Sequence, residues 1–538
     1  MPRPQLILVL HAHLPWVRHP EFPRFHEESW LFEALLECYL PLCGAMTEWS
    51  AQQWPWRLAL SISPTLAAAL DDPLLRERFE AHFDALQDLA GREIERQHFQ
   101  PEFREVAEFY AARLTELRRT WHRIGGDVLS EFARHASTGH LELFTCSATH
   151  AVLPLLKPSP QALDAQIALA LATHERRFGR VPAGFWLPEC AYAPEVEAAL
   201  RARGVQWTIL ETHGLLQATP RPQAAVFAPV ITPGGLVVFG RDPASARQVW
   251  SRDGGYPGDP RYREFHRDLS QDAEREYLRH WQTGEDTEPT FTGLKYHAVT
   301  GTGDQKAVYQ RSAALAAVRD HAAHFVQTRA AWARRAVAEA PLPEDRPVVC
   351  VAPYDAELFG HWWFEGPEFL SEVVRLVSAP DSPVELTTPS EHLRAYPRCE
   401  CVQPNTSSWG EGGHLRAWLD VRNAWMQAPL RAAEEMMQQL ARRYRDGDRP
   451  RLAPDANFER ALRQAARELL LAQASDWPFL LRHGTAGDYP RRRFTEHLAA
   501  FHQLAQMLQG LPPWDAALLR DREFRHPLFP DVDWRLWA

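Results

Sequence analysis

The sequence predicts an α/β fold, a barrel built on a parallel sheet, followed by an all-helical region. Up to about residue 395, short apolar runs alternate with segments whose apolar side chains recur at helical spacing. That alternation is typical of parallel strands joined by crossover helices. Beyond about residue 400, runs of strand length disappear and helical patterns continue to the C-terminus. We therefore expect a catalytic barrel at residues 1–398 and a helical domain at residues 399–538.

Each expected element has a local signal in the chain. Apolar runs of four to eight residues, bounded by Gly, Pro, Ser or polar residues, predict strands at 6–10, 57–62, 141–147, 184–189, 205–211, 236–239, 348–355 and 384–388. Helical spacing predicts helices at 31–49, several within 71–137, and others at 160–178, 307–339, 424–446, 457–474 and 491–509. Residues 240–262 are dense in Gly and Pro, so a long loop over the cleft is expected there.

Composition and charge narrow the class of partner. The net charge of −10 disfavours nucleic acid and anionic membranes. The 20 tryptophans favour a sugar ligand, because flat indole rings bind sugar faces, although a Trp-rich core explains part of that number. Seven cysteines without a CxxC pair disfavour a disulfide framework or a thiolate zinc site. The N-terminal apolar run is too short for a signal peptide, so a cytoplasmic protein is expected.

Two acids end apolar strands that lie far apart in the sequence. Glu189 follows the run at 184–188, and Asp355 follows the run at 348–354. Strand ends of a parallel barrel meet at one mouth, and two carboxyls meeting there can cleave a glycosidic bond with retention. A structural ion pair is the alternative for Glu189. Glu357 shares a face with Asp355, and the spacing alone does not choose between them.

Several histidines also follow predicted strand ends, namely His11, His13, His150 and His213. A single histidine at such a place is more often a hydrogen-bonded core residue, and a metal site is a rival use for the group. The sequence holds no HExxH motif. Lysine occurs only at Lys157, Lys295 and Lys306, and Lys295 is a candidate functional residue in this arginine-rich chain.

Five motifs are spread over most of the chain: HAHLPW at 11–16, LELFTCSATH at 141–150, GFWLPECAY at 184–192, APYDAELFGHWWFEG at 352–366 and SSWGEGGH at 407–414. In content and order they resemble the five sequence regions of glycoside hydrolase family 57. The versions here most resemble the family's 1,4-α-glucan branching enzymes. The resemblance implies a (β/α)7 barrel, an incomplete relative of the eight-fold barrel, with a C-terminal helical domain.

The resemblance also implies roles for individual residues. It makes Glu189 the nucleophile and Asp355 the general acid/base, and so chooses Asp355 over Glu357. It implies sugar contacts at His11, His13, His150, Trp281, Trp409, Trp418 and Asp476, and no metal or organic cofactor. The branching enzymes are expected to carry a shielding tyrosine at the tip of the 240–260 loop. The first tyrosine of that segment here is Tyr256, which raises the expected share of hydrolysis.

The expected activity is cleavage of an α-1,4-glucan through a covalent glycosyl-enzyme, followed by transfer to a 6-hydroxyl. The alternatives are a family 57 α-amylase or 4-α-glucanotransferase, a metal-dependent carbohydrate deacetylase, and a non-catalytic glucan-binding protein. The expected partner is an α-glucan, without nucleic acid or membrane, and a monomer is favoured.

Overall fold

Seven parallel strands form a ring in the computed structural model, which describes residues 2–251, 254–281, 291–301, 303, 305–339, 345–445, 455–511 and 514–538. Hydrogen bonds join β4-β3-β2-β1-β8 in one sheet and β5-β7 in another. Single parallel bridges, Gly184 to Trp207 and Arg241 to Val351, connect the two sheets. The strands are β1 (Gln5–Ala12), β2 (Leu58–Ile62), β3 (Leu141–Cys146), β4 (Phe185–Trp186), β5 (Trp207–Leu210), β7 (Val237–Gly240) and β8 (Val349–Asp355). The predicted incomplete barrel is confirmed.

Side chains of β1 alternate between two cores. Ile7 and Val9 point into the ring, where they pack with Trp186, Trp207 and other buried residues. The intervening leucines of β1 pack outward against the helices. Burial on both faces explains why these strands read as continuous apolar runs. Because the strands are parallel, all their carboxyl ends meet at one edge of the ring.

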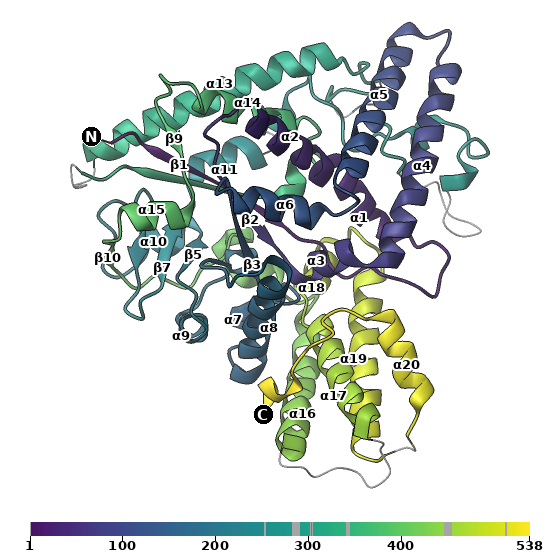
Figure 1. The fold of residues 1–538 in the computed structure, drawn as a ribbon, viewed down its shortest axis with the longest axis vertical. Coiled ribbons are helices and arrows are strands. Elements are labelled where there is room, and N and C mark those ends of the chain that lie inside the picture. Colours follow the sequence, from purple (N-terminus) through teal and green to yellow (C-terminus); the bar gives the residue numbers. More distant parts are fainter. Residues whose placement is uncertain are drawn as a thin grey trace.

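Helices surround the ring and also form a separate bundle (Figure 1). The predicted helix at 31–49 is one run in which a π-helical turn, η2 (Leu35–Tyr39), joins α1 (Ser29–Ala34) to α2 (Leu40–Ala51). The remaining barrel helices of at least seven residues are α3 (Pro64–Asp71), α4 (Pro73–Arg96), α5 (Pro101–Arg123), α6 (Val128–Ser137), α8 (Pro160–Phe178), α9 (Pro194–Ala202), α11 (Pro243–Trp250), α13 (Arg311–Glu339), α14 (Gly366–Val377) and α15 (Pro389–Ala395).

The sequence predicted one long loop at 240–262, and the structure differs from that prediction. It contains the helix α11 (Pro243–Trp250), and residues 252–253 within it lie outside the described residues. The Asp242 side chain accepts hydrogen bonds from the amides of Ala244 and Ser245, and Pro243 occupies the first helical position. An aspartate N-cap followed by proline is a helix-start signal that the Gly and Pro content of the segment obscured.

The boundary between barrel and bundle lies near residue 427. Two short strands that the sequence did not predict, β6 (Val230–Ile231) and β10 (Glu400–Cys401), pair with each other beside β7, so the chain just past 398 still belongs to the barrel. β9 (Glu385–Leu386) pairs only with the start of β1. The bundle comprises α16 (Gln427–Arg445), α17 (Asp455–Ala472), α18 (Asp476–His483), α19 (Tyr489–Leu508) and α20 (Ala516–Arg525). Asp446, the predicted end of the first of these, lies outside the described residues.

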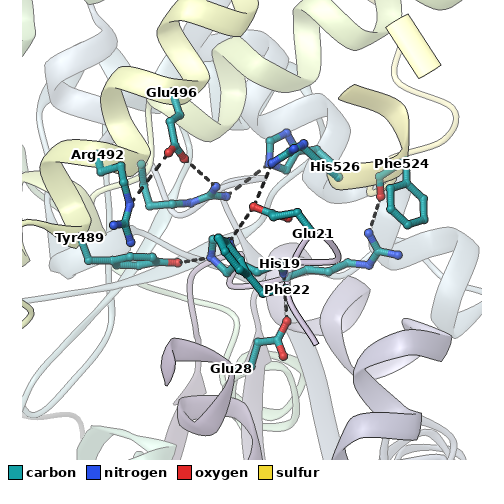
Figure 2. Close-up of polar contacts among 12 residues, drawn as sticks. His19, Glu21, Phe22, Glu28, Tyr489, Arg492, Glu496, Phe524 and His526 are labelled. Atoms are coloured by element: carbon teal, nitrogen blue, oxygen red, sulfur yellow. Dashed lines mark hydrogen bonds and ion pairs between the residues drawn. The ribbon is translucent and has the colours of Figure 1, made fainter. Parts of the chain in front are cut away.

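The bundle is fastened to the segment that follows β1 (Figure 2). His19 Nε2 lies 2.9 Å from the hydroxyl of Tyr489, and the Glu21 carboxylate pairs with Arg525 at 2.9 Å. The Arg18 guanidinium donates to the carbonyl of Phe524. His19 is 2% exposed, so its contact with Tyr489 is shielded from water. In the described residues, the helices are too short or too polar to cross a bilayer.

Candidate active site

Glu189 lies in a strained turn immediately past β4. It has left-handed backbone angles (φ 63°), as do Cys190 (φ 47°) and His150 (φ 57°). Such angles cost a non-glycine residue about 1–3 kcal/mol and cluster at functional sites. The sequence suggested that the strand continues through Glu189. The structure instead has a 3-10 turn there, η3 (Pro188–Cys190), which directs Glu189 into the mouth of the barrel.

The Glu189 carboxyl is largely buried and receives hydrogen bonds from two segments beyond the barrel strands. The Trp409 indole N–H donates to Oε2 at 2.8 Å, and the Ser475 hydroxyl lies 3.5 Å from Oε1. His150 Nδ1 lies 3.8 Å from Oε1. Burial raises the pKa of Glu189 to about 8, the Trp409 hydrogen bond opposes this, and the charge of Asp355 adds to it. Asp355 therefore lies close enough to Glu189 for its charge to raise that pKa.

Asp355 is the last residue of β8 and pairs across the sheet with His11 of β1. Burial raises its pKa to about 7, while His13 and Arg241 oppose that rise. No described residue donates a hydrogen bond to the Asp355 carboxyl, whereas Trp409 donates to Glu189. The two acids therefore differ in environment: only Glu189 has a fixed donor that stabilises its anion.

Glu357 is occupied by structural hydrogen bonds. Its Oε1 accepts from the hydroxyl of Tyr39 and, at 3.1 Å, from the backbone N–H of His13. Burial raises the pKa of Glu357 to about 8. These bonds connect the π turn η2 to the loop after β8, so Glu357 holds the barrel mouth together and Asp355 is the better candidate acid.

Three histidines form a layered group beside Glu189 and Asp355. His13 and His150 stack with ring centroids 3.8 Å apart, and His11 Nε2 lies 2.9 Å from His150 Nε2. His11 and His13 are each held by a serine of the β2 end, Ser61 at 3.1 Å and Ser63 at 2.8 Å. Burial holds the pKa of His11 and His150 well below the usual range, so both rings are neutral.

The bundle completes the site through the start of α18. Asp476 lies 3.1 Å from His13 Nε2, and the Ser475 hydroxyl lies 2.7 Å from His150 Nδ1. Ser475 thus contacts both His150 and Glu189. The sequence pointed to Asp476 through the resemblance, but nothing in the sequence singled out its neighbour Ser475.

Trp409 is held among several side chains. It lies edge-on to Trp186 with centroids 5.0 Å apart, and the guanidinium of Arg241 lies 5.2 Å from its ring. Trp250, at the end of α11 and 38% exposed, lies 5.8 Å from the same ring. Arg241 directly follows β7, so the strand-end rule could have found it. Trp250 was hidden by the loop prediction.

Three predicted residues lie away from this group. Trp418 is buried at 1% exposure, and its ring leaves no room for a Cβ at Gly410, so it supports the 407–414 segment from behind. His213 Nε2 lies 2.8 Å from the carbonyl of Gly413 in that segment. Trp281 packs against His82 and lines a cavity of about 150 Å³ with Phe25 and Phe32, and none of the Glu189 group lines that cavity.

Two groups of donor atoms in the described chain lie close enough to hold a metal ion. One is His11, Cys146 and His150, and the other is Glu468, His497 and His526. In the second group, the Glu468 carboxylate already lies within 2.8 Å of a ring nitrogen of each histidine. Glu468 and the two histidines thus form a hydrogen-bonded group of three in which the carboxylate already holds both rings.

The structure is thus an incomplete barrel with two buried acids, Glu189 and Asp355, at the ends of two of its strands. A model described as glycosyl hydrolase family 57 matches residues 7–403, and one described as 1,4-alpha-glucan branching enzyme, C-terminal, matches residues 429–537. The chain therefore belongs to glycosyl hydrolase family 57.

Individual relatives extend over nearly the whole chain. A 1,4-alpha-glucan branching enzyme of Thermococcus kodakarensis is 31% identical, with 98% of this chain and 77% of the relative covered. The structure is similar to that of the alpha-amylase AmyC of Thermotoga maritima, with a TM-score of 0.90 and 36% identity over 100% of this chain and 99% of that one. It is also similar to a branching enzyme of Pyrococcus horikoshii, with a TM-score of 0.87 and 31% identity over 99% and 97% of the two chains.

Proposed function

We propose that the protein is a 1,4-α-glucan branching enzyme, which cleaves an α-1,4 bond and transfers the released chain to a 6-hydroxyl of another glucan. One observation carries the proposal. The bundle, which matches the C-terminal region of branching enzymes, delivers Ser475 and Asp476 onto Glu189, His150 and His13. The similarity of both matched parts to branching enzymes supports the same reading.

In the proposed reaction, Glu189 attacks the anomeric carbon while Asp355 protonates the departing glycosidic oxygen. Burial raises the pKa of both acids, to about 8 for Glu189 and to about 7 for Asp355, so the free site holds protons at neutral pH. The reaction needs one proton to be lost and the other to stand on Asp355, next to the glycosidic oxygen that it protonates. The indole N–H of Trp409 stabilises the Glu189 anion that remains. Asp355 then takes the proton of the incoming hydroxyl.

Transfer in place of hydrolysis requires that water be kept from the glycosyl-enzyme. Tyr256 does not supply that cover, because it is 7% exposed and its hydroxyl lies 2.8 Å from His324 Nδ1 on α13. Trp250 contacts Trp409, which in turn donates to Glu189. We assign to Trp250 the role of covering the intermediate.

A family 57 α-amylase is the second candidate, since the Thermotoga maritima protein of similar structure is described as one. Incubation with amylose separates the two. A branching enzyme produces α-1,6 linkages, measured by isoamylase digestion, in excess over new reducing ends. An amylase produces reducing ends with no α-1,6 linkages, and that result would overturn the proposal.

A further inference from the structure

The proposed reaction gives no role to Cys146, although its thiol lies among the active-site histidines. Cys146 ends β3, His150 follows β3 after a short turn, and His11 lies near the end of β1. The Cys146 sulfur and one ring nitrogen of each histidine lie within 4.8 Å of one another, and all three residues are buried. Histidine and cysteine are the protein ligands that zinc prefers. The group is therefore a candidate metal site, assembled from residues whose spacing in the sequence shows no zinc motif.

The two histidines are already oriented as metal ligands are. Their Nε2 atoms face each other at 2.9 Å, and about 3.3 Å separates two nitrogens bound to one tetrahedral zinc ion. The other nitrogen of each ring is held by a serine, since His11 Nδ1 lies 3.1 Å from the Ser61 hydroxyl and His150 Nδ1 lies 2.7 Å from that of Ser475. A metal-binding histidine donates its second ring N–H to an oxygen in this way, and that bond fixes the tautomer that leaves Nε2 free for the metal.

Cys146 supplies the anionic ligand of the group. Its sulfur makes only a long contact, 3.4 Å, with the carbonyl oxygen of Ser147. Burial raises the pKa of this thiol, and the charges of Asp476 and Glu189 add to the rise. A thiolate in this place is therefore stable when a cation neutralises it, and a bound metal ion deprotonates a coordinating thiol. The same two carboxylates favour a cation here.

An ion can reach the group from the substrate side. The side chains of His13, Asp476 and Glu189, which lie beside the two histidines, are 10%, 14% and 16% exposed. The movement needed to enclose the ion is small. Zinc bound to nitrogen at about 2.0–2.1 Å and to sulfur at about 2.3 Å leaves about 3.6 Å between the two donor atoms. A pair at the 4.8 Å limit thus closes by about 1 Å, which side-chain rotation provides.

We propose that His11, Cys146 and His150 bind Zn²⁺ or a similar thiol-binding divalent cation, and that this ion inhibits the enzyme. The two Nε2 atoms and the Cys146 thiolate are the protein ligands, and a water molecule completes the tetrahedron. On binding, the thiol releases its proton to solvent, and the proton shared by the two Nε2 atoms moves to Nδ1 of the ring that carried it.

The ion is an inhibitor and not a cofactor. Its positive charge beside Glu189 weakens that carboxylate as a nucleophile, and it holds His11 and His150 in one arrangement. The inference goes beyond the proposed function, because it does not depend on which reaction the two acids carry out.

The binding test titrates chelator-treated protein with Co²⁺ and then with Zn²⁺. It uses a Cys399→Ser/Cys401→Ser background, because these are the two cysteines that are not buried, so that the signal reports on buried thiols alone. Co²⁺ should produce a thiolate-to-cobalt charge-transfer band in the near ultraviolet, and Zn²⁺ should remove it. The Glu468 group described above contains no thiol and does not give this band.

Cys146→Ser should abolish the band. It should also weaken calorimetric zinc binding by about 100-fold or more, because loss of even an outer hydrogen-bond partner of a ligand costs about 10–100-fold. Cys43→Ser is the matched control, since Cys43 is a buried cysteine of α2 outside the group, and it should keep the band and the affinity. Cys146→Ala provides the same readouts where Cys146→Ser does not fold, and melting temperatures establish which variants are folded.

The activity test adds Zn²⁺ to the same proteins acting on amylose. Zn²⁺ should inhibit the background protein and Cys43→Ser, and chelator should restore both, whereas Cys146→Ser should keep its activity in Zn²⁺. A cobalt spectrum without the thiolate band, or equal zinc affinity in Cys146→Ser and Cys43→Ser, would overturn the site. Zinc bound through Cys146 without loss of activity would overturn the inhibition. A protein that leaves amylose intact without added metal would overturn the proposed function, while the spectrum and calorimetry would still decide the metal site.

Discussion

Replacement of Glu189 by glutamine should remove turnover and at the same time stabilise the fold. The sign of the stability change follows from the raised pKa of Glu189. The folded protein keeps its Glu189 proton up to about pH 8, whereas the unfolded chain, with an ordinary pKa of 4.5, releases it earlier. Wild-type stability contributed by this group is therefore lost as the pH rises from about 4.5 to about 8. Glutamine is neutral at every pH and its carbonyl oxygen still accepts the Trp409 indole N–H.

The difference of about 3.5 pKa units corresponds to an upper limit of about 5 kcal/mol, and we expect about 2–4 kcal/mol at pH 8 after relaxation of the site. For a chain of this length that raises the melting temperature by about 2–4 °C. Calorimetric scans of wild type and Glu189→Gln at pH 5 and pH 8 measure it, with the exposed Glu435→Gln as control. Activity on amylose should fall by about three or more orders of magnitude. A variant that is less stable at pH 8 than wild type would refute the burial argument, and a variant that keeps its activity would refute the nucleophile.

Four further outcomes follow from the site. Asp355→Asn should abolish cleavage of amylose but retain most cleavage of α-maltosyl fluoride, whose leaving group needs no proton; equal loss on both substrates would contradict the acid role. Glu357→Gln should keep activity within about 3-fold, because its raised pKa leaves Glu357 uncharged at neutral pH. With wild type, kcat/KM on amylose should decline above about pH 8, where both acids have lost their protons, and the decline should be absent with the fluoride. Trp250→Ala should raise the ratio of new reducing ends to α-1,6 linkages several-fold, whereas Tyr256→Phe should leave that ratio unchanged.

The barrel and most of its candidate site residues can be predicted from the sequence because they depend on local patterns. Parallel strands buried on both faces read as apolar runs, and the residues at their ends, among them Glu189, His11 and His13, must meet at one edge. Asp355 was chosen over Glu357 only through the family motif. The structure adds a physical reason, since Tyr39, distant in sequence, occupies Glu357.

Other features of the site could not be predicted from the sequence, chiefly because they depend on contacts between distant segments. Ser475 has no motif of its own and gains its place only when α18 packs against the β3 end. Trp250 was missed because Gly and Pro content outweighed the Asp242 cap signal. Trp418 has the residue type of a sugar platform, but its burial against Gly410 is a tertiary property.

The segment after β1 and the bundle are fastened together by His19, Tyr489, Glu21 and Arg525, and the same docking carries Asp476 to His13. During synthesis the strands of the barrel can pair with one another before the bundle, and therefore these contacts, have formed. We expect such a partly synthesised molecule to lack the proposed activity, and to become competent only when the helices from residue 427 onward are in place.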